Sequence, residues 1–156
     1  KPNQVTLVPD PPEAITSNAG WNTIAHLSFL QDIIADLKEH GIRTSIFIGT
    51  EPEMIKNAAL TNTDRIELYT EPYAAHYHID REKAIAPFVE AANLAAKAGM
   101  MINAGHDLSL ENLKFFNECI PFLKEVSIGH ALIADALYFG LEKTISLYKQ
   151  QLVKER

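Results

Sequence analysis

The chain has 156 residues, of which 47% are apolar and 22% are charged, and a formal net charge of -6, which is ordinary for one globular domain. The acidic balance argues against general nucleic-acid binding, although backbone N–H groups could still hold a phosphate locally. No apolar run approaches the roughly 18 residues that a membrane span needs, no secretory signal pattern is present, and the single cysteine, Cys119, excludes an internal disulfide. We therefore expect a cytoplasmic protein that does not engage a membrane.

Short apolar runs alternate with longer amphipathic stretches along the whole chain. In chain order this pattern predicts five strand–helix units: strand 4–10 with helix 23–40, strand 43–49 with helix 51–60, strand 64–70 with helix 81–99, strand 100–105 with helix 109–118, and strand 124–130 with helix 131–155. Pro87 is expected to kink the third helix. Residues 16–22 form a polar loop, and His76 and His78 are expected in a mobile loop after the third strand.

The strand–helix alternation predicts a parallel sheet covered by helices. No linker or change of composition divides the chain, so we expect one domain over residues 1–156. Two architectures fit the pattern: a five-stranded doubly wound sheet, and part of a (βα)8 barrel. Both bind their ligands at the carboxyl ends of the strands.

Gly105-His106 and Gly129-His130 each follow a predicted strand, and so they are expected at that ligand-binding edge. The imidazole of His106 could transfer a proton near neutral pH, or it could form a structural hydrogen bond in its loop. Gly129-His130 opens the last helix without a Ser, Thr, Asp or Asn cap. An anion such as phosphate, or water, would then have to satisfy the first N–H groups of that helix.

Glu67 lies in the middle of the third strand and shares a face with Arg65 and Tyr69. A buried carboxylate is costly unless it is paired or used. It could stabilise a cationic intermediate or orient a histidine, or it could form a structural ion pair with Arg65 or another interior charge. Position alone slightly favours the ion pair. His76 and His78 could bind a metal, but the sequence offers no evident third ligand.

Six stretches in order resemble the pyridoxine 5'-phosphate synthase family, from its fourth strand to its end: "VTLVPD", "AITSNAGWN", "GIRTSIFIG", "RIELYTEPYA", "MINAGHDLSLENL" and "VSIGHALIADALYFGL". The resemblance implies a (βα)8 TIM barrel with added helices, usually assembled into a homo-octamer. It also implies an enzyme that condenses 1-deoxy-D-xylulose 5-phosphate with 3-amino-2-oxopropyl phosphate. The products are pyridoxine 5'-phosphate, phosphate and water, and no metal or organic cofactor is needed.

The resemblance also implies roles for individual residues. His106 matches a catalytic proton donor, and Glu67 matches a carboxylate that stabilises charge in the transition state. Thr16 matches a contact to the deoxyxylulose phosphate, and Gly129 with His130 matches the site of the aminooxopropyl phosphate. Asp107 stands where some members have glycine, and a substrate contact through its backbone N–H would survive that change.

The family's first three strands, with a glutamate general base and another catalytic histidine, have no counterpart here. A complete barrel has about 250 residues, so we expect this chain to be the C-terminal part of a longer enzyme, and to be inactive alone. Two other hypotheses remain: a non-catalytic, phosphate-binding five-stranded domain, and a structural half-barrel that pairs with another copy.

Overall fold

The computed structural model describes residues 1–154. All five predicted strands are present, and they are β1 (Gln4–Leu7), β2 (Arg43–Ile48), β3 (Arg65–Tyr69), β4 (Met101–Gly105) and β5 (Leu123–Ser127). The helices described are α1 (Leu27–Glu39), α2 (Pro52–Leu60), α3 (Glu71–Lys97), α4 (Leu113–Cys119), α5 (His130–Phe139) and α6 (Leu141–Gln151). The protein is therefore an α/β fold, as the strand–helix alternation predicts.

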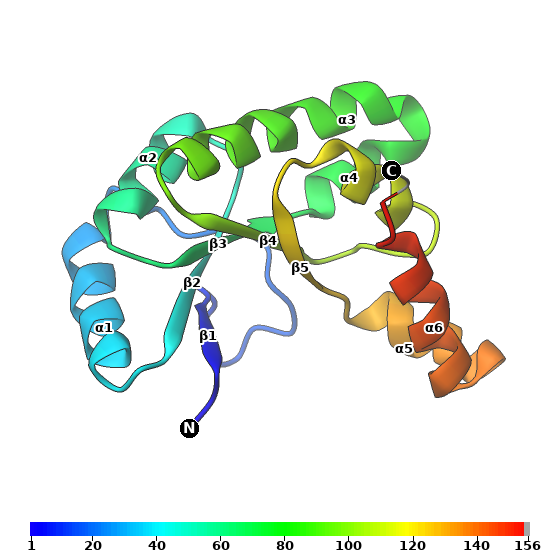
Figure 1. Cartoon of the computed structure of the whole chain (residues 1–156), viewed down its shortest axis with the longest axis horizontal. Coiled ribbons are helices and arrows are strands. Elements are labelled where there is room, and N and C mark those ends of the chain that lie inside the picture. Colours follow the sequence, from blue (N-terminus) through cyan, green and yellow to red (C-terminus); the bar gives the residue numbers. More distant parts are fainter. Residues whose placement is uncertain (155–156) are drawn as a thin grey trace.

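The strands form one parallel sheet whose spatial order, β1-β2-β3-β4-β5, is also their order in the chain. A doubly wound sheet reverses direction at a switch point, and this sheet does not. Because βα crossovers are right-handed, steps that all run one way place the helices on one side of the sheet. Figure 1 shows α1, α2, α3 and α4 arranged around the outside of the strands. This arrangement is consistent with part of a (βα)8 barrel.

The outward-facing side chains of the central strands form the hydrophobic core with the helices. Ile46, Ile48, Ile66, Leu68 and Ile102 have no exposed surface. Burial of each such side chain stabilises the fold by roughly 1.5–3 kcal/mol. Period-2 alternation then turns the intervening residues toward the concave face of the sheet. That face is polar, and it carries the candidate functional residues.

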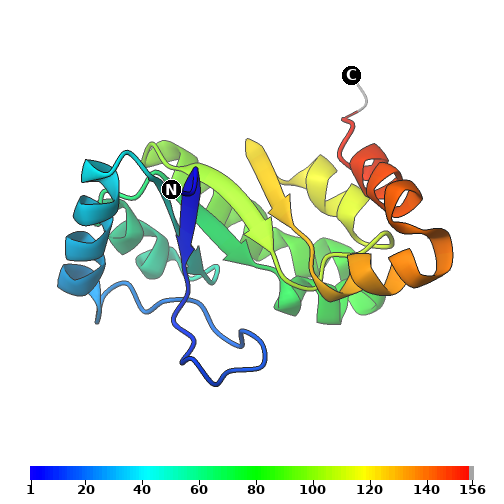
Figure 2. The same cartoon turned by 90° about the horizontal axis from the view of Figure 1, so that it is seen from below.

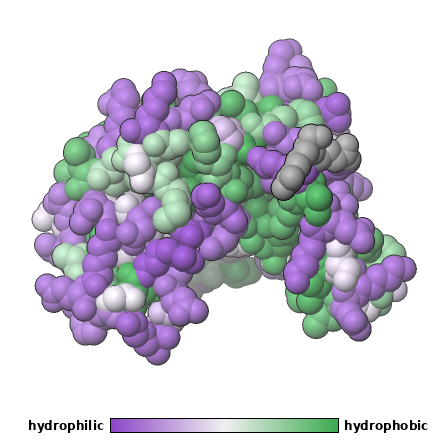
Figure 3. Space-filling view, viewed as in Figure 1, coloured by the Kyte–Doolittle hydropathy of each residue, from purple (hydrophilic) through white to green (hydrophobic). Residues whose placement is uncertain are grey.

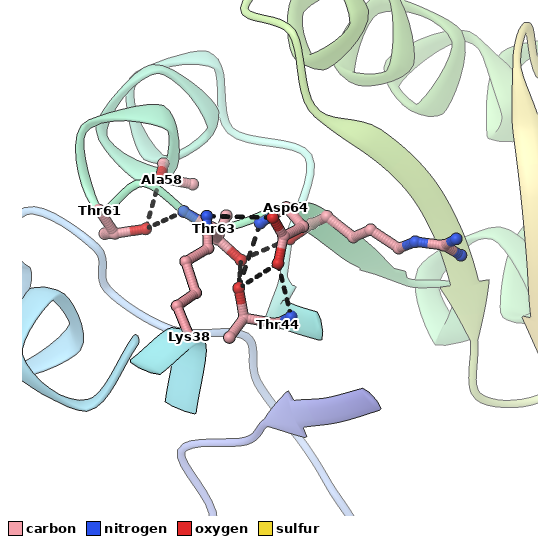
Figure 4. A network of polar contacts seen from close by, with 7 residues as sticks. Lys38, Thr44, Ala58, Thr61, Thr63 and Asp64 are labelled. Carbon is pink, nitrogen blue, oxygen red and sulfur yellow. Dashed lines mark hydrogen bonds and ion pairs between the residues drawn. The ribbon is translucent and has the colours of Figure 1, made fainter. Parts of the chain in front are cut away.

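A polar network joins the amino ends of β2 and β3 (Figure 4). The carboxylate of Asp64 accepts hydrogen bonds from the N–H of Thr44 at 2.8 Å and from its hydroxyl at 3.0 Å, and it pairs with Lys38 at 3.0 Å. The Thr63 hydroxyl donates to Thr44 Oγ1 and to the carbonyl of Arg65. Burial raises the pKa of the Asp64 carboxyl, but the Thr44 N–H and the Lys38 ammonium together bring that pKa below its ordinary value.

Helix α3 differs most from its prediction. It begins at Glu71, so His76 and His78 lie on a helix and not in a mobile loop. Pro72 occupies one of the first two helical positions, where its missing N–H costs nothing. The break in this helix lies at Asp80 and not at Pro87. Asp80 accepts a hydrogen bond from the N–H of Lys83, and it thereby caps the second segment.

The predicted final helix, 131–155, is two helices, of which the second ends at Gln151, and the predicted last residue lies outside the described residues. Gly140 separates α5 from α6 with a φ of 80°, a conformation that glycine adopts without strain. Strand β5 ends at Ser127, three residues before its predicted end at 130. Helix α5 begins at His130, one residue earlier than predicted. Strand β1 ends at Leu7 because Pro9 lacks the N–H that a sheet needs.

Strands β1 and β5 are the two edges of the sheet, and each has one partner strand. Apolar side chains are also exposed on α5, where Leu137 is 83% and Tyr138 is 86% exposed. Figure 3 shows hydrophobic surface at the lobe formed by α5 and α6 and in the hollow beside it. Over residues 1–154, none of the helices is both long enough and apolar enough to span a bilayer.

Candidate active site

A cavity lies at the carboxyl ends of the strands, lined in part by the loop after β1 and by the start of α5. Figure 2 shows both segments on the side of the sheet toward which the strand arrows point. The volume of the cavity is about 510 Å³. The residues that line it come from four strands, three loops and the start of α5. They include all six that the sequence singled out: Thr16, Glu67, His106, Asp107, Gly129 and His130. The geometry therefore brings together residues that lie up to 114 positions apart in the chain.

His106 follows β4 immediately and is held from both sides. Its Nε2 lies 2.9 Å from the hydroxyl of Thr16, and its Nδ1 lies 2.9 Å from the carboxylate of Asp107. The edge of its ring meets Tyr69, with ring centroids 5.1 Å apart. An acceptor at Nδ1 favours a proton on that nitrogen, which leaves Nε2 to face Thr16 and the cavity. The contacts thus fix the orientation that a proton-transferring imidazole needs.

The backbone at His106 and Asp107 is unusual, with φ values of 83° and 59°. Residues other than glycine pay about 1–3 kcal/mol for such conformations, which persist where the surroundings enforce them. The Thr70 hydroxyl provides that enforcement, because it donates to the carbonyl oxygens of Gly105 and His106. This turn is what projects the imidazole into the cavity.

Glu67 extends from β3 into the same cavity and is only 7% exposed. The Thr6 hydroxyl donates a hydrogen bond of 3.0 Å to its Oε2. The expected ion pair with Arg65 is absent, because Arg65 pairs with Glu125 at 2.8 Å and donates to Asn103 at 2.9 Å. Within residues 1–154, Glu67 has no cationic partner within 4.0 Å, so it is a buried carboxylate available to a ligand.

Gly129 and His130 form the start of α5 at the rim of the cavity. No side chain caps this helix end, so its first N–H groups need another acceptor. A Cβ built on Gly129 would meet nothing within 4 Å, which means that the space before the helix is open. Exposed N–H groups and the positive end of the helix dipole favour an anion here.

The carboxylate of Asp107 is 42% exposed and contacts the imidazole of His106, while its carbonyl accepts from Asn112 at 3.2 Å. Asp107 therefore lies in the cavity as an orienting partner of the histidine, a contact that the sequence did not indicate. The sequence placed Tyr69 on the same strand face as Glu67 but did not indicate its contact with His106. Burial, with the carboxylates of Glu71 and Asp107, raises the pKa of the Tyr69 hydroxyl, which therefore stays protonated near neutral pH.

Thr6, Phe47 and Ser127 line the cavity as well and were not selected from the sequence. Strand alternation could have placed each on the concave face. Nothing else in the sequence marks a hydroxyl or a phenyl group on a strand as part of a site. No cluster of three His, Cys, Asp or Glu side chains able to hold a metal occurs among the residues described. His78 instead contacts Glu111 at 3.1 Å on the surface.

Comparison with known proteins gives the family. The model of the family "Pyridoxal phosphate biosynthesis protein PdxJ" matches residues 1–154. The pyridoxine 5'-phosphate synthase of Parabacteroides distasonis is 64% identical over 96% of this chain and 63% of its own length. Those of Phocaeicola vulgatus and Cytophaga hutchinsonii are 60% and 58% identical, over 97% and 99% of this chain and 64% and 65% of their own lengths.

The chain thus spans slightly less than two thirds of the length of the curated relatives that it matches. The family match, in contrast, covers every described residue, from the strand that begins the sheet to the end of α6. The chain belongs to the PdxJ family of pyridoxal phosphate biosynthesis proteins.

Proposed function

We propose that the polypeptide containing this chain is a pyridoxine 5'-phosphate synthase. It would condense 1-deoxy-D-xylulose 5-phosphate with 3-amino-2-oxopropyl phosphate to pyridoxine 5'-phosphate, phosphate and water, in the biosynthesis of vitamin B6. Relatives that carry this name are 54–64% identical to the chain, which supports the assignment. The observation that carries it is the meeting of His106, Glu67 and Gly129-His130 around one cavity.

His106 is proposed to donate a proton to the reacting substrate. Its Nδ1 faces the Asp107 carboxylate, which orients the ring so that Nε2 can carry the proton toward the cavity. The Thr16 hydroxyl contacts Nε2 of His106 in the structure. This hydroxyl is proposed to contact the deoxyxylulose phosphate when that substrate binds. Substrate binding would therefore exchange a Thr16–His106 hydrogen bond for contacts to the ligand.

Glu67 is proposed to stabilise positive charge that develops in the transition state. A carboxylate that is nearly dry acts strongly on such charge, because the low local dielectric weakens its attraction little. The start of α5, with Gly129 and His130, is proposed to bind the phosphate of the aminooxopropyl substrate. The N–H of Asp107 would add a donor, while its carboxylate contacts the imidazole of His106.

We further propose that the chain supplies the last five βα units of a closed (βα)8 barrel, as one domain over residues 1–156. The concave polar face and the two single-partner edges support this reading. A homo-oligomer in the cytoplasm that works without a metal or an organic cofactor is part of the same proposal. The competing function, a phosphate-binding domain without catalysis, gives no reason for an oriented His106–Asp107 pair beside a buried carboxylate.

The test is direct. The complete polypeptide should form pyridoxine 5'-phosphate from the two substrates, and formation should stop when either one is omitted. Inorganic phosphate should be released in step with the product. Binding of both substrates without product or phosphate release would instead favour the non-catalytic domain.

A further inference from the structure

The Glu67 carboxylate is surrounded by residues from three other strands. Thr6 on β1 reaches it, although β2 lies between β1 and β3. Gly105 on β4 and Ser127 on β5 lie on its other side. Strands in a flat sheet are about 4.8 Å apart, so side chains two strands away meet only over a concave face. The curvature of the sheet therefore brings residues from several strands around this carboxylate.

Gly105 leaves space for one oxygen of the Glu67 carboxylate, Oε1. A Cβ built at position 105 would lie 2.5 Å from Glu67 Oε1 and 3.0 Å from the Cβ of Ser127. Gly105 does not have a positive φ, so an alanine would not be strained by the backbone. The closest conflict is with the flexible end of the Glu67 side chain, which could move away at little cost in stability. The contacts with Ser127, at 3.0 Å from its Cβ and 3.3 Å from its carbonyl oxygen, would need a shift of a few tenths of an ångström. The space beside Gly105 is therefore occupied by the Glu67 carboxylate.

Thr6 holds the other oxygen. Its hydroxyl donates to Glu67 Oε2 at 3.0 Å, and this is the hydrogen bond found for that carboxylate within residues 1–154. The bond is partly buried, and hydrogen bonds to charged groups are the stronger class. Without it, nothing among the described residues would fix the rotation of the carboxylate about its last bond.

We propose that Thr6 and Gly105 are positioning residues that hold Glu67 in its working orientation, with Thr6 fixing Oε2 and Gly105 leaving room for Oε1. The effect on turnover rests on the proposed function of Glu67, but the orientation itself does not. Neither residue needs to touch substrate. Their contribution should thus appear in kcat and leave KM nearly unchanged, because it affects a group that acts in the transition state.

The experiment uses four variants of the complete polypeptide. Thr6→Val keeps the shape and removes the hydroxyl, and it should lower kcat about tenfold, the effect of losing one hydrogen bond to a charged group. Thr6→Ser restores the hydroxyl and should recover turnover to within about threefold. Gly105→Ala should lower kcat by a similar factor with an unchanged melting temperature. Gly99→Ala is the matched control: its φ of 82° makes it destabilising, but it lies outside the cavity and should keep its kcat.

Coupling to Glu67 is tested by repeating Thr6→Val and Gly105→Ala in a Glu67→Ala background. There, neither change should lower the remaining turnover further, because the group they act on is gone. Crystal structures of the two single variants should show the carboxylate rotated or displaced. An unmoved carboxylate, or an equal loss of kcat with and without Glu67, would overturn the proposal.

The two proposals fail in different ways. If the unmodified enzyme makes product but Thr6→Val and Gly105→Ala keep full kcat, the positioning proposal is wrong and the function stands. If the unmodified polypeptide makes no product, the function is wrong. The crystal structures then decide the positioning proposal alone, since a displaced carboxylate supports it and an unmoved one refutes it.

Discussion

Arg43 on β2 and Glu125 on β5 lie 3.2 Å apart, nitrogen to oxygen, although two strands separate them. Over a flat sheet their backbones would be about 14 Å apart, at roughly 4.8 Å per strand. The contact therefore records how strongly the sheet curves. Arg65 pairs with the same carboxylate at 2.8 Å, so one glutamate joins β2, β3 and β5 beneath the cavity.

Removal of the Glu125 carboxylate should lower the free energy of unfolding. Glu125→Ala would leave Arg65, whose side chain is 7% exposed, buried without its anionic partner. Loss of one partner of a buried pair typically costs about 3–5 kcal/mol. We expect a loss at the lower end of this range, because Glu125 itself is 46% exposed. Denaturant unfolding of the complete polypeptide, with and without Glu125→Ala, measures this loss of unfolding free energy. The double change Arg65→Met with Glu125→Ala should recover part of the loss, and no recovery would contradict this explanation.

The strands and the parallel sheet could be predicted from the sequence, because the alternation of apolar runs with amphipathic stretches indicates them directly. The start of α3 could not, since "YAAHYHID" carries too few apolar residues at helical spacing to outweigh its polar appearance. Of the six candidate site residues, four follow a strand or place a charge inside one, namely Glu67, His106, Gly129 and His130, whereas Thr16 and Asp107 were selected through the family resemblance alone. Thr6 carried no such mark, because its partner Glu67 lies 61 positions away and is reached only over a curved sheet.

The network at Asp64 should make stability depend on pH. Its carboxyl has a pKa below the ordinary value of 3.8 in the folded protein, so its stabilising contribution is complete above that value. The contribution is lost as pH falls below 3.8 and passes through the lowered pKa. Asp64→Asn should therefore lower the free energy of unfolding by about 1–3 kcal/mol near pH 7. The difference between the two proteins should shrink as pH falls below 3.8, and a difference that is constant with pH would exclude the charge as its cause.

Gly129→Val should weaken binding of the phosphorylated substrate. A Cβ at this position would meet nothing within 4 Å, so the valine side chain would enter the open space where the anion is proposed to sit. The fold should tolerate the change, and the melting temperature should shift little. Calorimetric titration with inorganic phosphate and with 3-amino-2-oxopropyl phosphate decides the matter. Unchanged affinity for both ligands would mean that the anion binds elsewhere.

Residues 1–156 produced alone should have no synthase activity and should self-associate. The edges β1 and β5 would offer unpaired N–H and C=O groups, and exposed side chains on α5 would add apolar surface. Adding the residues that the relatives have beyond this match, as a separate fragment, should restore solubility and turnover. Sedimentation together with a synthase assay tests this expectation. A well-folded monomer with cooperative unfolding would revive the self-contained five-stranded domain.

The central claim is that this cavity performs the chemistry, and His106→Asn tests it most directly. Asparagine accepts the left-handed backbone found at this position, where φ is 83°, so the fold should be preserved. It cannot donate a proton as an imidazolium does. The measurement is the rate of pyridoxine 5'-phosphate formation by the complete polypeptide with both substrates saturating. We predict a loss of about a hundredfold or more with an unchanged melting temperature. Near-normal turnover in the folded variant would contradict the account.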